Sequence, residues 1–92
     1  MKTDFKTSYK RDFKKISDQR ILDEIKKIEK SVEKARSPGD IPKMKKIVGF
    51  KDTYRIKFGV YRIRIEIKKD LVVFTDVGRR DKIYNSLSIL FL

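Results

Sequence analysis

The sequence predicts an α+β fold, in which a small, curved, mainly antiparallel sheet follows an N-terminal helical hairpin. Apolar residues recur with a helical period as far as residue 35, and after residue 54 they alternate with charged ones, which is typical of strands. A chain of 92 residues supplies one modest hydrophobic core, so we expect a single domain over residues 1–92. The predicted order is β-α-α-β-β-β with a short C-terminal helix.

The N-terminal part is expected to form one edge strand and two helices. Phe5 lies among polar residues in the segment 1–7, which suits a short edge strand. Ser8 is the predicted N-cap of the first helix, and Asp18 is a candidate cap of the second. Residues 37–39 (Ser-Pro-Gly) end the second helix. That helix has a regular apolar stripe: Ile21, Ile25, Ile28, Val32 and Ala35.

The second half is expected to form strands joined by tight turns. Residues 54–58 and 61–68 alternate apolar and charged side chains, and residues 59–60 (Gly-Val) suit a two-residue turn between them. Residues 71–77 form a largely apolar run, which predicts a central strand covered on both faces. The tail 81–92 contains the expected short helix and ends in an apolar run.

The positive charge is concentrated in the second half of the chain. The formal net charge is +12, and 13 basic residues face only five acidic ones after residue 40. Residues 41–49 are expected to be a basic connector with three apolar anchors: Met44, Ile47 and Val48. An excess of this size favours a polyanionic partner.

The missing residue types exclude several classes of enzyme. There is no Cys, which excludes thiol nucleophiles, disulfides and Cys-based metal sites. There is no His, so the usual acid/base group at neutral pH and the commonest metal ligand are both absent. We expect no metal and no cofactor. The sequence has neither an export signal nor an apolar run that would span a membrane, and we expect a cytoplasmic protein without membrane contact.

The predicted strand hairpin carries an unusual concentration of like charge. A turn at residues 59–60 pairs Lys57 with Arg62 and Arg55 with Arg64. Like charges directly opposite each other destabilise a sheet, and these four cations share one face with no carboxylate between them. A solvated strand face is the ordinary interpretation of alternating charge, but such a face normally mixes signs. We therefore favour an anion-binding face.

One reaction remains open to a basic face without His, Cys or a carboxylate cluster. In RNA the ribose 2′-hydroxyl can attack the adjacent phosphate, which requires a base, cations around the phosphate and an acid for the leaving 5′-oxygen. Crowding by the three arginines disfavours the ammonium form of Lys57 and moves it toward acting as a base. The electrostatics alone indicate only anion binding.

Two sequence blocks suggest a family. The pattern YRIKFGVYRIRIEI, followed by LVVFTDVGRRDKIY, resembles the RelE/ParE superfamily of bacterial and archaeal toxins, and in particular the RelE-like mRNA interferases. The resemblance implies a RelE-like, microbial ribonuclease-type fold. It also implies an endoribonuclease toxin of a type II toxin–antitoxin system, which cleaves translated mRNA in the ribosomal A site and is held inactive by a cognate antitoxin.

The resemblance also implies roles for individual residues. Arg55 and Lys57 match the family's basic catalytic pair, and Lys57 is the candidate base because Arg does not readily give up its proton. Arg62 matches the residue that stabilises the transition state. Arg80 matches the arginine that protonates or neutralises the leaving oxygen, and Tyr84 matches the tyrosine that orients the substrate.

Further basic residues are candidate contacts to RNA and to the ribosome, including its 16S rRNA. Arg79 occupies a position where some relatives have His. The full set of candidate contacts is Lys43, Lys45, Lys46, Arg64 and Arg79.

Two alternatives remain open at this point. A ParE-like protein of the same fold would inhibit DNA gyrase and leave mRNA intact. A non-catalytic RNA-binding module, or an inactive toxin homologue, would bind RNA in a salt-dependent way without being toxic.

Overall fold

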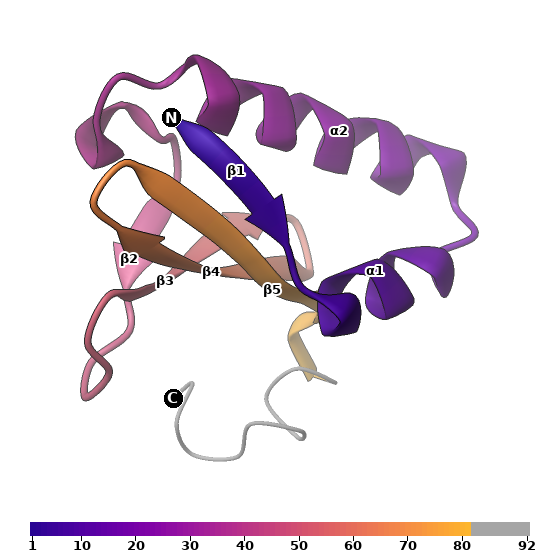
Figure 1. Ribbon diagram of the computed structural model, residues 1–92. Coiled ribbons are helices and arrows are strands. Elements are labelled where there is room, and N and C mark those ends of the chain that lie inside the picture. The colour runs from indigo at the N-terminus through magenta and orange to yellow at the C-terminus, as the bar shows by residue number, and fades with distance from the viewer. Residues whose placement is uncertain (82–92) are drawn as a thin grey trace.

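The structure is a computed structural model that describes residues 1–81 (Figure 1). The predicted α+β class, with a helical hairpin before most of the strands, is confirmed. The predicted C-terminal helix and Tyr84 lie outside the described residues. The elements, in chain order, are β1 (Lys2–Phe5), α1 (Thr7–Lys14), α2 (Gln19–Lys34), a 3₁₀ helix (Pro38–Asp40), β2 (Met44–Lys46), β3 (Thr53–Phe58), β4 (Tyr61–Lys68) and β5 (Leu71–Arg79).

Within residues 1–81 the strands form one sheet in the order β1-β5-β4-β3-β2. β1 runs parallel to β5, and every other neighbouring pair is antiparallel, so the sheet is mainly antiparallel as predicted. A parallel pair needs a long crossover, and here the two helices and three strands separate β1 from β5 in sequence. In Figure 1, β1 lies alongside β5, and α2 spans the sheet above it.

The connector predicted over residues 41–49 contains an edge strand that the sequence analysis missed. β2 pairs Met44 with Ile56 and Lys45 with Arg55. Three residues are too few to show an alternating pattern, and lysines are typical of sheet edges because they oppose pairing with another chain. Val48 is 92% exposed, so the prediction that it anchors the connector is wrong. Ile47, also a predicted anchor, is buried.

The two helices begin differently from each other. At α2 the predicted cap is confirmed, because the Asp18 carboxylate accepts a hydrogen bond from the Arg20 backbone N–H at 2.9 Å. At α1 the predicted cap is wrong: the N-cap is Lys6, and Ser8 lies within the first turn. The Ser8 hydroxyl instead donates to the Thr75 carbonyl at 2.6 Å, which ties α1 to β5.

No helix in residues 1–81 is long and apolar enough to cross a membrane.

The hydrophobic core lies between the sheet and both helices. α2 contributes Ile25 and Val32, both fully buried, and α1 contributes Tyr9. They pack on the apolar side of β4 and on Phe74 of β5. The core therefore covers one face of the sheet, which we call the covered face.

β5 is central, as predicted, but it is not covered by helices on both faces. Val73 and Asp76 alternate with the core residues of β5, and both are half-buried on the side away from the helices. A β-bulge near Arg64 and Ile65 shifts the register, so that Thr75 has no single partner on β4. We call the face opposite the helices the open face.

Candidate functional site

The register of the β3–β4 hairpin is the one that the sequence predicts. Phe58 pairs with Tyr61 around the two-residue turn, Lys57 with Arg62, and Arg55 with Arg64. Gly59 has φ of +56°, a conformation that favours glycine, which accounts for the tight turn at this point. Since side chains alternate across a strand, the four cations project from the open face.

The edge strand extends this charge into two rows across the sheet. In the row near the turn, the Lys57 N–H donates to the Lys43 carbonyl at 3.3 Å, and Lys57 faces Arg62. In the next row, Lys45 pairs with Arg55, which in turn pairs with Arg64.

Lys46, a predicted RNA contact, does not lie on the same face of the sheet as Lys45. It pairs with Tyr54 and so lies at an alternate position, away from the row of Lys45 and Arg55. Of the lysines in β2, the open face therefore includes Lys45 but not Lys46.

Arg62 is the most buried of the predicted site residues. Its side chain turns back onto the hairpin: Nη1 donates to the Gly59 carbonyl at 3.0 Å and to the Tyr61 carbonyl at 2.8 Å. Only 4% of the residue is exposed, and its Nε has no hydrogen-bond partner among residues 1–81. Opposite Arg62 on β5 lies Gly78, which has no side chain to compete for this space.

Arg64 does not belong to an uninterrupted cationic face. Its guanidinium forms an ion pair with Asp76 of β5 and also donates from Nε to the Thr75 hydroxyl at 3.1 Å. The prediction that no carboxylate interrupts the face is therefore wrong. The hairpin of β3 and β4 contains no carboxylate at these positions, and the pairing of β4 with β5 brings Asp76 opposite Arg64.

The end of β5 lies beside the hairpin turn. Arg79 pairs with Tyr61, and the Arg80 N–H donates to the Val60 carbonyl at 2.6 Å. The side chains of Arg79 and Arg80 are both exposed, and Arg79 forms an ion pair with Asp81 at 3.6 Å. Arg79 lies one position away from Gly78 and so on the alternate side of the strand from Arg62. Tertiary structure thus brings Arg80 to the turn that also positions Lys57 and Arg62.

Lys57 is the exposed member of its cross-strand pair. Among residues 1–81 its side chain forms no ion pair or hydrogen bond, in contrast to the side chains of Arg62 and Arg64. Within the same part of the chain, no cluster of three or more His, Cys, Asp or Glu residues could hold a metal ion.

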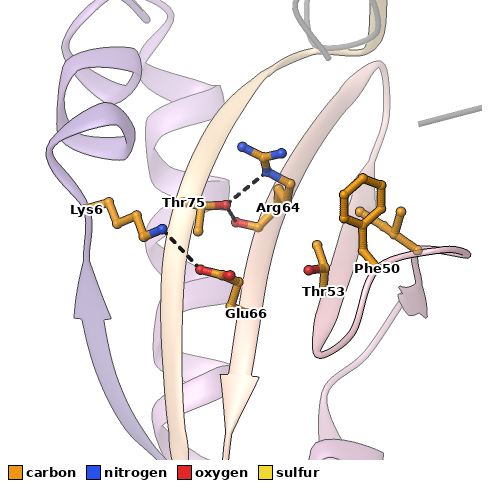
Figure 2. Close-up of a pocket in the computed structure, with 7 residues that line it drawn as sticks. Lys6, Phe50, Thr53, Arg64, Glu66 and Thr75 are labelled. Carbon is orange, nitrogen blue, oxygen red and sulfur yellow. Dashed lines mark hydrogen bonds and ion pairs between the residues drawn. The ribbon is translucent and has the colours of Figure 1, made fainter. Parts of the chain in front are cut away.

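The open face also contains a hollow that the sequence analysis did not find. Phe50 lies on one side of it, and Lys6 and Glu66 lie on the other (Figure 2). Ile47 also lines the hollow. Alternation along β4 would have placed Glu66 on the same face as Arg64, but the sequence gives no signal for Phe50, which comes from a loop.

Comparison with known proteins assigns the chain to a family. The model of "ParE toxin of type II toxin-antitoxin system, parDE" matches residues 4–84, which is most of the chain. The chain is therefore a member of the RelE/ParE superfamily of type II toxins.

Within that superfamily the chain is RelE-like. It is 35% identical over 86 residues to Toxin RelE3 of Methanocaldococcus jannaschii, an alignment that covers 92% of this chain and 97% of the relative. The toxin fold of the RelB–RelE antitoxin–toxin complex from Methanococcus jannaschii superposes with a TM-score of 0.79 at 31% identity, covering 90% of this chain and 96% of that one.

A more distant structure agrees with the fold. The isolated RelE toxin of E. coli superposes with a TM-score of 0.64 at 22% identity, covering 99% of this chain and 98% of the other. The predicted RelE-like fold, a mixed sheet with two helices, is confirmed by these comparisons.

Proposed function

We propose that this RelE-like toxin is a metal-independent endoribonuclease that cleaves translated mRNA in the ribosomal A site. One observation carries the proposal: the strand pairing brings Lys57, Arg62 and the backbone of Arg80 to the same hairpin turn. These residues come from three different strands or strand ends, and the exposed side chains of Lys57 and Arg80 have no part in the hydrophobic core. The proposed substrate places the protein's site of action in the cytoplasm.

The proposed reaction is an attack of the ribose 2′-oxygen on the adjacent phosphorus. The 2′-hydroxyl proton passes to the unprotonated Nζ of Lys57, and the bond from phosphorus to the 5′-oxygen breaks. Arg80 neutralises the charge that develops on the leaving oxygen, and the oxygen takes up a proton from Arg80 or from water. The products are a 2′,3′-cyclic phosphate and a 5′-hydroxyl, and no metal or cofactor takes part.

The arginines have distinct proposed roles in this reaction. Arg55 and Arg80 are half-exposed and exposed, respectively, and can approach phosphate oxygens directly. Arg62 donates to the Gly59 and Tyr61 carbonyls, so its role in the transition state requires those partners to be exchanged for a phosphate oxygen. Tyr84 remains a proposed substrate-orienting residue on the strength of the resemblance alone.

The proposed protein partner is a cognate antitoxin. Support comes from the superposed M. jannaschii toxin, which is part of a RelB–RelE complex. A strongly basic toxin is complemented by a segment that supplies acidic and apolar side chains. The proposed ribosome contacts are Lys43, Lys45, Lys46, Arg64 and Arg79.

The test is a reconstituted translation reaction in which the 5′ ends of a reporter mRNA are mapped. We expect Lys57→Gln to lower the cleavage rate about 10²- to 10⁴-fold, as for loss of a general base. Arg80→Gln should lower it about 10²- to 10³-fold. Lys68→Gln, an exposed change at the far end of β4, is the matched control and should cleave normally.

A second measurement tests the chemical route. A reporter with a single 2′-deoxynucleotide at the mapped site should resist cleavage there, and the fragments of the normal reporter should carry 5′-hydroxyl ends. Fragments with 5′-phosphate ends would contradict the proposed attack. Intact mRNA at every codon with the unmodified toxin would contradict the ribonuclease function itself.

A gyrase inhibitor is the second candidate, because the matching family model is named for ParE toxins. It predicts inhibition of DNA supercoiling by purified gyrase, with no new mRNA ends. The third candidate, an RNA-binding module without catalysis, predicts RNA binding without mRNA cleavage or growth arrest. The translation and supercoiling assays together separate all three.

A further inference from the structure

A hollow of about 160 Å³ opens on the open face, two residue positions along β4 from Arg62. Phe50 and Ile47, which line it, come from the segment between β2 and β3. Phe50 lies at one side (Figure 2). Lys6 lies at the other side, next to Glu66, and Thr53 lies between Glu66 and Phe50 (Figure 2). An apolar cavity of about 150 Å³ holds a benzene-sized ring, so the hollow has the size needed for one aromatic ring.

The walls of the hollow differ in chemistry. Phe50 is 38% exposed and presents an aromatic surface. Across from it, Lys6 Nζ lies 3.1 Å from Glu66 Oε1, and the Glu66 side chain keeps 29% of its surface exposed. The hollow therefore offers a stacking surface on one side and a carboxylate acceptor on the other.

Arg64 forms a fixed boundary between the hollow and the candidate catalytic residues. Its ion pair with Asp76 and its hydrogen bond to Thr75 hold the guanidinium in place. Two residues along a strand span about 7 Å, so the Arg62 position lies close to the hollow. A chain whose phosphate lies at the hairpin cations can thus place a neighbouring base in the hollow.

We propose that this hollow is a nucleobase subsite, in which one unstacked base of a single-stranded RNA stacks on Phe50 and donates an exocyclic amino group to Glu66. The proposal rests on the proposed RNA substrate and adds to it a second contact, away from the reacting phosphate. Single-stranded RNA is commonly bound by aromatic stacking of bases beside a basic groove that follows the backbone, and both parts are present here.

Glu66 gives the subsite a preference among bases. An ionised carboxylate only accepts hydrogen bonds, so it pairs with the amino group of cytosine, adenine or guanine. At the corresponding edge position uracil presents a carbonyl oxygen, which a carboxylate repels. Lys6 offsets part of the charge of Glu66 without removing its capacity as an acceptor.

Binding of short, non-cleavable RNA tests the subsite directly. The probes are fluorescently labelled 2′-O-methyl hexamers of cytidine and of uridine, and their affinities are measured by anisotropy at fixed salt. Phe50→Ala should weaken binding of the cytidine hexamer about 5- to 150-fold, the range measured for loss of one base stack. Phe50→Tyr, which keeps an aromatic ring, should bind the cytidine hexamer with the affinity of the unmodified protein.

Val48→Ala is the matched control for the loop. Val48 is 92% exposed in the same segment and does not line the hollow, so its loss should leave both affinities unchanged.

Glu66→Gln tests base preference. The change removes one negative charge and so raises both affinities together, but it should lower the ratio of cytidine to uridine binding about 5-fold, because a glutamine amide can pair with either base.

The outcomes separate this proposal from the proposed function. Unchanged binding by Phe50→Ala, or an unchanged cytidine-to-uridine ratio for Glu66→Gln, would overturn the subsite. So would a loss confined to antitoxin affinity, which would identify the hollow as a protein contact. Base-dependent hexamer binding without any mRNA cleavage would leave the subsite standing and reject the ribonuclease function. If the toxin cleaves mRNA but Phe50→Ala does not change hexamer binding, the ribonuclease function would stand and the subsite would be rejected.

Discussion

The two faces of β4 show how differently one strand can be used. Ile63 and Ile65 point into the core and have no exposed surface. Arg62, Arg64 and Glu66 alternate with them on the open face, and each is engaged with a different element: the hairpin turn, β5 and the segment before α1. The same backbone thus presents a uniform apolar surface on one side and separate polar contacts on the other.

The difference indicates where stability and function can be separated. Burial of apolar surface stabilises the fold in proportion to the area removed from water, so changes on the covered face should affect folding. The open face places like charges opposite one another, which opposes folding slightly and favours anions. Four predictions test this division, beginning with the largest expected effect.

Phe74 tests the covered face. It is fully buried and its ring lies 5.0 Å from that of Phe5 and 5.3 Å from that of Tyr9. We expect Phe74→Ala to lower the free energy of unfolding by about 3–5 kcal/mol, measured by urea denaturation. Phe50→Ala removes the same side chain from the open face and should cost under about 1 kcal/mol, because Phe50 is partly exposed. Similar losses for both variants would refute the division between the faces.

Gly59 tests the turn that both faces share. Its φ of +56° disfavours any residue with a Cβ, although no atom of residues 1–81, its two chain neighbours aside, lies within 4 Å of the Cβ position. Gly59→Ala should therefore lower the free energy of unfolding by about 1–2 kcal/mol through backbone strain alone. Gly39→Ala, at a glycine without positive φ, is the control and should be nearly neutral in the same denaturation measurement. Equal effects would argue against strain at the turn.

Tyr9 tests a polar group on the covered face. Its hydroxyl donates to Glu29 Oε2 at 2.7 Å, and burial, followed by this hydrogen bond and the charge of Glu29, raises the pKa of Tyr9 well above its usual range. Above about pH 10 the tyrosine ionises in the unfolded chain but stays protonated in the folded one. Stability should therefore be fully retained below that pH and fall above it, by up to about 1.4 kcal/mol per pH unit.

Tyr9→Phe separates this contribution from other alkaline titrations. The variant should lose about 1 kcal/mol at neutral pH, the usual net value of one hydrogen bond. Its stability should also fall less steeply than that of the unmodified protein above pH 10, as measured by denaturation at several pH values. Parallel slopes for the two proteins would contradict the assignment to Tyr9.

Asp76 tests the carboxylate of the open face. Its ion pair with Arg64 is partly exposed, with 21% and 26% of the two side chains accessible, so Asp76→Asn should cost under about 1 kcal/mol of stability. The same change should strengthen RNA binding, because it removes a negative charge from the anion-binding face. Anisotropy with an RNA hexamer at several salt concentrations measures this. Glu24→Gln, an equal charge change on exposed α2 surface, should have a smaller effect; equal gains would mean that only net charge matters.

The parts of the fold with strong local patterns could be predicted, and those that depend on neighbours could not. The apolar stripe of α2 and the register from Lys57–Arg62 to Arg55–Arg64 agree with the structure. β2 was missed because a three-residue, lysine-rich edge has no pattern of its own. Ser8 was misassigned as a cap because a hydroxyl near a helix start can equally bond to a distant carbonyl, here that of Thr75.

The candidate site shows the same limit. Arg55, Lys57 and Arg62 were placed together correctly because a two-residue turn sets their spacing. Arg80 follows directly on β5, which continues through Gly78, opposite Arg62, to Arg79. What brings Arg80 to the turn is the pairing of β5 with β4.

The sequence by itself determined the period of each element, the hairpin register and the excess of positive charge on alternate strand positions, because these depend only on local geometry. Tertiary structure decided which of the cationic side chains form ion pairs or hydrogen bonds. It gave Arg64 the Asp76 carboxylate, folded Arg62 onto its own turn, left Lys57 exposed, and set Phe50 across from Glu66. Arg64 and Asp76, like Phe50 and Glu66, are more than ten residues apart in the chain, and the pairing of strands in one sheet brings them within reach.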